Sequence, residues 1–156
     1  MIPKVRNRQD LFVIDAFLTK IGAPQWLLPI ASELPEAVWN LHEIAKGPRV
    51  AAITWGAEDL STELGASASR DPRTGEYLSL FKQVRNNCLL AAKAAGVQAI
   101  DGVFTFLDNE RGLIEETIEA RVIGFDGKMT IHPKQIVVVH KFLAPSNQEY
   151  KEARDL

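Results

Sequence analysis

Two carboxylates in the sequence each follow a short apolar run, and they are the residues best suited to carry chemistry. Glu33 follows the run 26–31, and Asp59 follows the run 50–55 after a short glycine-containing turn. If these runs are neighbouring strands of a parallel sheet, their C-terminal ends meet at one rim, and the carboxylates meet there too. Mg²⁺ commonly takes one or two carboxylates and leaves its other positions to water and substrate. The plainer alternative is that both carboxylates simply favour the first turn of a helix, where the helix dipole stabilises them.

Other polar residues are expected at the same rim. The Gly56–Glu58 turn leaves backbone N–H groups at the start of a helix, an arrangement that can hold a substrate carboxylate. Lys4, Asp101 and His132 stand at the ends of three further apolar runs. A structural, hydrogen-bonded role for His132 is an equal alternative, and many α/β turns resemble this glycine turn.

The remaining candidate residues are interpreted as structural. His42 and His140 fall within predicted helices, and Cys88 lies on the apolar stripe of the longest one. Trp39 is expected in the core. The acidic run 115–119 is expected to be the solvated face of a helix.

The elements that must position these residues alternate along the chain. Apolar runs of strand length are 2–5, 26–31, 50–55, 98–103 and 128–131. Helical patterns are 9–21, 34–46, 58–64, 77–95, 110–123, 135–142 and 148–155, with a surface loop at 66–76. Strands that alternate with helices imply right-handed crossovers and a parallel sheet. Five such strands fit either a doubly wound sheet or five-eighths of a barrel, and the pattern alone leaves both open.

Composition sets the outer limits. The chain has 156 residues, of which 46% are apolar and 24% charged, so it can build one sizeable core. A single cysteine excludes an internal disulfide, and a net charge of −2 gives no support for a nucleic-acid partner. No apolar run approaches the roughly 20 residues of a membrane span, and the charged first ten residues contain no signal-peptide core. These features predict a cytoplasmic protein with neither a nucleic-acid nor a membrane partner.

Seven motifs in the chain are shared with one protein family. They are Ile2–Val5 (IPKV), Pro29–Glu33 (PIASE), Gly56–Leu60 (GAEDL), Ala99–Val103 (AIDGV), Asp108–Leu113 (DNERGL), Gly124–Ile136 (GFDGKMTIHPKQI) and Phe142–Ser146 (FLAPS). Through them the chain resembles the HpcH/HpaI aldolase–citrate lyase β-subunit family, in its CitE-like branch that cleaves acyl-CoA esters. The resemblance covers essentially the whole chain, and the GAEDL and GFxGKxxIHP motifs in this order are specific.

The resemblance implies a magnesium enzyme. The family binds Mg²⁺ through a glutamate and an aspartate, which match Glu33 and Asp59, so these are the expected metal ligands and catalytic residues. The metal chelates the keto- or hydroxy-acid part of the substrate and polarises the carbonyl that becomes or leaves as an enolate. Together with the ends of the apolar runs, this gives the residues expected to bind substrate: Lys4, Glu33, Gly56, Ala57, Glu58 and His132.

The family fold is a (β/α)8 barrel, which takes about 250 residues. The resemblance places residues 2–5 on its fourth strand, so the chain is expected to be a partial barrel of strands four to eight. Residues 1–156 are then one domain truncated at its N-terminus, without the R-x-N segment whose arginine grips the substrate. Because such a piece exposes two sheet edges, it is expected to pair with a complementary chain or with a second copy of itself.

The function that follows is a Mg²⁺-dependent carbon–carbon lyase acting on a short hydroxyacyl-CoA, such as citramalyl-, malyl- or citryl-CoA. Two alternatives stay open at this point. The chain is a non-catalytic fragment of such a lyase, or it is a related acyl-CoA thioesterase.

Overall fold

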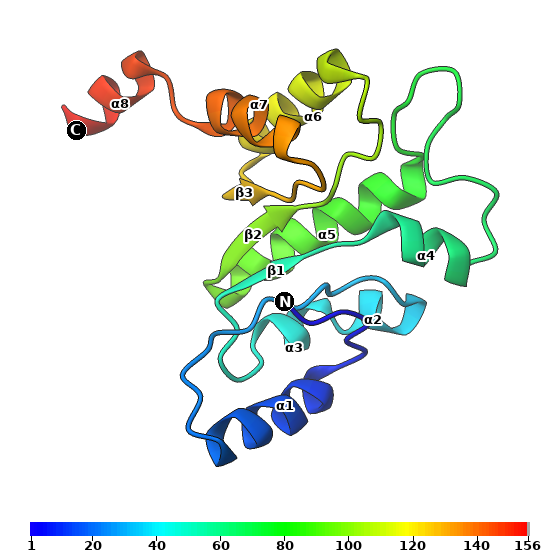
Figure 1. Cartoon of the computed structure of the whole chain (residues 1–156), viewed down its shortest axis with the longest axis vertical. Coiled ribbons are helices and arrows are strands. Elements are labelled where there is room, and N and C mark those ends of the chain that lie inside the picture. Colours follow the sequence, from blue (N-terminus) through cyan, green and yellow to red (C-terminus); the bar gives the residue numbers. More distant parts are fainter. Residues whose placement is uncertain (156) are drawn as a thin grey trace.

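A small parallel sheet lies at the centre of the molecule (Figure 1), and the computed structural model describes residues 1–155. Its three strands are hydrogen-bonded in chain order: β1 (Ala52–Thr54), β2 (Gln98–Asp101) and β3 (Gly127–Lys128). Two further segments continue the same order through isolated parallel bridges, namely Ile2 with Pro29, Leu27 with Val50, and Ile30 with Thr54. The five apolar runs therefore lie side by side in chain order, without the reversal of a doubly wound sheet in residues 1–155.

Regular strand is shorter than the sequence predicted. The runs 2–5 and 26–31 pair through single bridges instead of continuous ladders. Pro3 and Pro29 lack the N–H that a ladder needs, and Lys4 adopts a left-handed backbone with φ 51°, which turns the chain. The result is an α/β fold with a small regular sheet.

Helices cover the sheet as the alternating pattern predicts. They are α1 (Arg8–Lys20), α2 (Pro35–Trp39), α3 (Leu41–Ala45), α4 (Ala57–Glu63), α5 (Ser79–Ala95), α6 (Glu110–Ile123), α7 (Pro133–Leu143) and α8 (Asn147–Arg154). The predicted bounds of α6 are confirmed, because Asn109 caps its start and Gly124, with φ 106°, ends it.

The single helix predicted over 34–46 is wrong, since the structure divides it into α2 and α3 at Asn40. The Asn40 side chain donates to the carbonyl oxygens of Arg6 and Glu36, at 3.0 and 3.2 Å. Its competition for backbone groups interrupts the helix at this residue.

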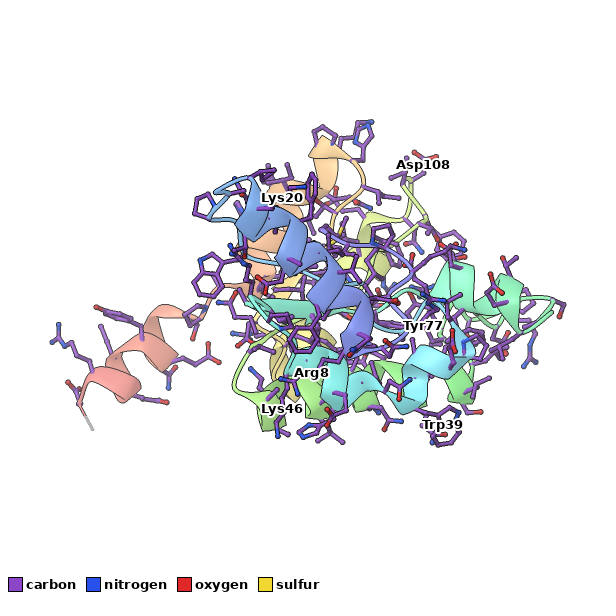
Figure 2. All side chains as sticks on the ribbon, turned by 90° about the horizontal axis from the view of Figure 1, so that it is seen from below. Arg8, Lys20, Trp39, Lys46, Tyr77 and Asp108 are labelled. Atoms are coloured by element: carbon purple, nitrogen blue, oxygen red, sulfur yellow. The ribbon has the colours of Figure 1, made fainter. Side chains whose placement is uncertain are left out.

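The core lies between the sheet and its helices. Ile53 of β1 and Ala99 of β2 are fully buried with Phe81 and Cys88 of α5, so the prediction that Cys88 is a core residue is confirmed. The prediction for Trp39 is wrong, because Trp39 is 88% exposed and projects from the surface in Figure 2. The helix ends at this residue, and the buried position in α2 belongs to Ala37.

None of the helices within residues 1–155 combines the length and apolar character that crossing a membrane requires.

Candidate functional site

Glu33 is a buried carboxylate held by the backbone of a neighbouring segment. It follows the second apolar run directly and is 6% exposed. The backbone N–H of Lys4 donates to Glu33 Oε2 at 2.5 Å. The left-handed conformation of Lys4 places this N–H toward the carboxylate, so the chain turn after the first run fixes the orientation of Glu33.

Asp59 lies in the first turn of α4 and pairs with the side chain of the same lysine. Lys4 Nζ is 3.1 Å from Asp59 Oδ1 and 3.6 Å from Glu63 Oε1. The hydrogen bond and the negative charge of Asp59 raise the pKa of Lys4. One residue thus contacts both predicted metal ligands, Glu33 through its backbone and Asp59 through its ammonium group.

The two carboxylates are close enough to repel each other. Burial raises the pKa of Glu33, the Lys4 N–H lowers it, and the charge of Asp59 raises it again, with a net upward shift. A divalent cation between the two carboxylates would relieve this repulsion. The part of the chain that the structure describes contains no cluster of three or more His, Cys, Asp or Glu side chains placed for a metal. The two carboxylates near each other are donors of the kind that Mg²⁺ accepts, since this ion commonly takes one or two protein carboxylates and fills its other positions with water and substrate oxygens.

Gly56 lies against Glu33 and leaves no room for a side chain. A Cβ at this position would lie 2.9 Å from Glu33 Cγ and 3.3 Å from Ile30 Cγ2. The Gly56 N–H donates to Ser32 Oγ at a long 3.4 Å. Ala57 begins α4 and is buried at 6% exposure. The turn therefore lies beside Glu33, as the sequence predicted.

Two of the predicted substrate-binding residues have their contacts elsewhere. Glu58 accepts a hydrogen bond from Ser69 Oγ at 3.4 Å, on the side of the 66–76 loop. His132 is the N-cap of α7, where its Nδ1 accepts from the Lys134 N–H at 3.1 Å. The structure thus brings together Lys4, Glu33, Gly56 and Asp59, while substrate-binding roles for Glu58 and His132 stay predictions.

A second group of charged residues, the Asp101 cluster, was not predicted as a unit. It consists of Asp101, Arg85, Lys128, Glu116 and Arg70. Asp101 accepts hydrogen bonds from Arg85 at 2.8 and 3.0 Å, from Lys128 Nζ at 2.9 Å, and from Trp55 Nε1 at 2.8 Å. Lys128 Nζ also donates to Glu116 Oε1 at 2.8 Å. Its members come from β2, β3, α5, α6 and the 66–76 loop, so the cluster joins the sheet to its outer layer.

The prediction that the acidic run 115–119 is a solvated face is wrong for Glu116, whose side chain is 10% exposed and ion-paired. Thr117 is fully buried, as its place on the inward side of the predicted helix indicates. The signal that could have located the cluster is Lys128, since a lysine inside a strand-length apolar run needs a buried acidic partner.

Asp101 remains ionised in this setting. Burial acts to raise its pKa, but the charge of Lys128 and the hydrogen bonds from Arg85 and Trp55 outweigh burial and hold the pKa at about 2. Asp101 therefore acts as a fixed negative charge within the fold.

Comparison with known proteins gives a consistent match. The family model described as HpcH/HpaI aldolase/citrate lyase matches residues 1–133. A citrate lyase subunit beta-like protein of Mycobacterium tuberculosis is 42% identical over 154 residues, covering 99% of this chain and 53% of the relative. A (3S)-malyl-CoA thioesterase of Cereibacter sphaeroides is 35% identical over 153 residues, covering 98% of this chain and 50% of the relative.

A solved structure shares the fold. The crystal structure of CitE from Mycobacterium tuberculosis, in complex with magnesium, acetoacetate and coenzyme A, superposes with a TM-score of 0.83 at 33% identity. The match covers 97% of this chain and 53% of that one. The chain spans about half the length of the curated relatives it matches.

Proposed function

Because the chain belongs to the HpcH/HpaI aldolase/citrate lyase family, we propose that it supplies the metal-binding part of a Mg²⁺-dependent carbon–carbon lyase. The proposed substrate is a short hydroxyacyl-CoA, such as citramalyl-, malyl- or citryl-CoA. The observation that carries this proposal is the meeting of Glu33 and Asp59, from two adjacent segments, around Lys4. The magnesium and coenzyme A in the M. tuberculosis CitE complex support the same assignment.

Glu33 and Asp59 are the residues that would hold the ion. When bound, Mg²⁺ supplies Lewis-acid polarisation of the substrate carbonyl and stabilises the negative charge that develops there. The Lys4 N–H fixes the Glu33 carboxylate, and Gly56 leaves the space that this carboxylate occupies. Lys4 Nζ neutralises Asp59 and lies where it can meet an anionic group of the substrate.

The proposed architecture is a partial (β/α)8 barrel made of strands four to eight. The chain-order pairing of five parallel segments supports it. Apolar side chains on the outer face of α1 and just beyond it lie in water, with Val13 71%, Phe17 61% and Trp26 74% exposed. Such exposed apolar side chains support a complementary chain or a second copy as the partner that completes the barrel.

A thioesterase is the second candidate function. Its support is the C. sphaeroides relative, a (3S)-malyl-CoA thioesterase that matches 98% of this chain. The same two carboxylates would serve it, because polarising a thioester carbonyl also favours attack by water.

The test is an assay with (3S)-malyl-CoA that measures two products separately. A lyase releases an aldehyde acid and retains the thioester as acetyl-CoA, whereas a thioesterase releases the free thiol of CoA. The 156-residue chain is assayed alone and fused to the N-terminal half of the M. tuberculosis relative. We expect little turnover from the chain alone, and aldehyde release from the fusion that EDTA abolishes.

Each other outcome has a defined meaning. Thiol release without aldehyde would replace the lyase with the thioesterase. Turnover by the chain alone would show that the chain needs no partner for activity. A folded fusion that is inactive on malyl-, citramalyl- and citryl-CoA would leave a non-catalytic role and overturn the proposal.

A further inference from the structure

A concave surface lies between the 66–76 loop and the start of α6. This groove has a volume of about 1180 Å³ and is lined in part by Arg70, Tyr77, Phe104 and Phe106. In Figure 1 the loop rises between α4 and α5 and stands beside α6. The groove is a different surface from the one formed by Glu33 and Asp59, neither of which lines it.

Arg70 is the buried cation of this groove. Its side chain is 7% exposed, with Cζ 3.4 Å from the centre of the Tyr77 ring. Its Nη1 donates to Glu116 Oε2 at 2.7 Å and to the Gly75 carbonyl at 3.0 Å. Its Nε and Nη2 are also buried, and they have no hydrogen-bond partner among residues 1–155. An unpaired donor in such a position costs free energy, so nearly all such donors in native structures have a partner from protein, water or ligand.

Arg85 shows what these two atoms are suited to bind. In Arg85 the Nε and Nη2 donate to the two oxygens of Asp101, at 2.8 and 3.0 Å. This side of the guanidinium forms a planar fork that matches both oxygens of a carboxylate. Arg70 presents the same fork without the carboxylate.

The charge of the Asp101 cluster selects the kind of anion. Its buried cations are Arg70, Arg85 and Lys128, and its buried anions are Asp101 and Glu116. Glu119 also pairs with Arg85, at 2.8 Å, and is 54% exposed. The three cations therefore face two buried anions and one half-exposed anion, so the cluster has little charge left to balance. A singly charged carboxylate disturbs this balance less than a phosphate dianion does.

We propose that the Arg70 fork binds the carboxylate of a small organic acid, at an anion site separate from the metal site. The rings of Phe104 and Phe106 lie with their centres 5.4 and 5.8 Å from Arg70 Cζ. With Tyr77 they form aromatic walls that suit a ligand with a flat or apolar body. Because Nε and Nη2 are covered, the ligand reaches them only after the side chains that cover them move aside.

The experiment follows the Arg70 side chain directly. The Nε–H signals of the arginines in the 156-residue chain are recorded by ¹H–¹⁵N NMR, and Arg70→Lys identifies the Arg70 signal. Sodium benzoate is titrated in, with sodium chloride and sodium phosphate as separate arms. We expect benzoate to shift the Arg70 signal along a saturable curve, while the Arg85 signal stays in place and chloride has no effect.

Calorimetry then compares the benzoate affinity of the parent chain with that of three variants. Arg70→Lys keeps the charge but loses the fork, and it should weaken binding by about tenfold or more. Arg73→Lys is the control, because Arg73 belongs to the same loop and is 86% exposed. Asp59→Asn should leave benzoate binding unchanged, which separates this site from the metal site.

The proposal is overturned if the Arg70 signal does not respond to benzoate, or responds equally to chloride. A response to phosphate alone also overturns it. The proposal is also overturned if the Arg70→Lys chain binds benzoate as tightly as the parent chain does. If Arg70→Lys does not fold, the titration of the parent chain decides, with the Arg70 signal identified by sequential assignment.

Discussion

Lys4 and Asp59 form an ion pair across the predicted metal site, with Nζ 3.1 Å from Oδ1. The lysine therefore places a positive charge where the proposed cation would be held. A metal that binds Asp59 must compete with this ammonium group, which holds the Asp59 carboxylate in place in the absence of the metal.

Asp59→Asn should weaken Mg²⁺ binding, because the amide removes one of two charged ligands. The Mg²⁺ affinity should fall by at least about tenfold. Losses of this size are the lower end of what is seen when a residue that only hydrogen-bonds to a metal ligand is replaced. Isothermal calorimetry of the folded chain measures it. Glu63→Gln is the control, since Glu63 also approaches Lys4 but at 3.6 Å. If the asparagine variant bound Mg²⁺ as the parent does, the metal site would lie elsewhere.

Gly56→Ala should displace Glu33, because the new Cβ would lie 2.9 Å from Glu33 Cγ. Overpacking of this kind costs about 1–3 kcal/mol in the free energy of unfolding. Urea denaturation measures that cost, and calorimetry should show weaker Mg²⁺ binding as well. Gly22→Ala is the control: it strains a left-handed backbone in open space, so it should lower stability without altering Mg²⁺ affinity.

Glu33→Gln should stabilise the fold at neutral pH while weakening Mg²⁺ binding. Burial first, and then the charge of Asp59, raise the Glu33 pKa above that of an unfolded glutamate. The folded state therefore binds the proton more tightly, and stability falls as the pH rises through the raised pKa. The thermal midpoint of the glutamine variant should exceed that of the parent at pH 7, and the difference should shrink in acid. An unchanged midpoint at both pH values would contradict the assigned repulsion.

Asp101→Asn should destabilise the fold by about 3–5 kcal/mol, because it leaves Arg85 and Lys128 buried without their shared anion. The pKa of Asp101 is depressed to about 2, so its contribution is present at neutral pH. That contribution is lost as the pH falls from the unfolded aspartate range toward 2. Urea denaturation across pH measures both effects. Glu115→Gln, in an exposed pair on α6, should change stability by less than about 1 kcal/mol.

The sequence predicted a helix accurately where the residues that begin and end it lie next to it in the chain. The 110–123 helix was predicted to the residue, since its cap and terminal glycine adjoin it in sequence. The break at Asn40 was missed because it depends on the Arg6 carbonyl, 34 residues away. The exposure of Trp39 follows from that break and was missed with it.

The same contrast between neighbouring and distant residues applies to the candidate site. Glu33 and Asp59 were found because each follows an apolar run, and parallel runs bring their ends together. The Asp101 cluster was missed because its five charges are spread from residue 70 to residue 128 and meet only between the sheet and its outer layer. The left-handed turn at Lys4, which directs its N–H to Glu33, also carries no sequence signal, because lysine rarely adopts it.

The Asp101 cluster also constrains how this chain can diverge. Each of its charges is bound to at least one other buried charge, so losing any one of them leaves a buried partner with one fewer counter-charge. A lineage that replaces Lys128 with an apolar residue leaves Asp101 paired with Arg85 and Glu116 paired with Arg70, each without its second cation. Substitutions at these five positions should therefore appear together among homologous chains, whereas those at the exposed Arg111 and Glu115 drift independently.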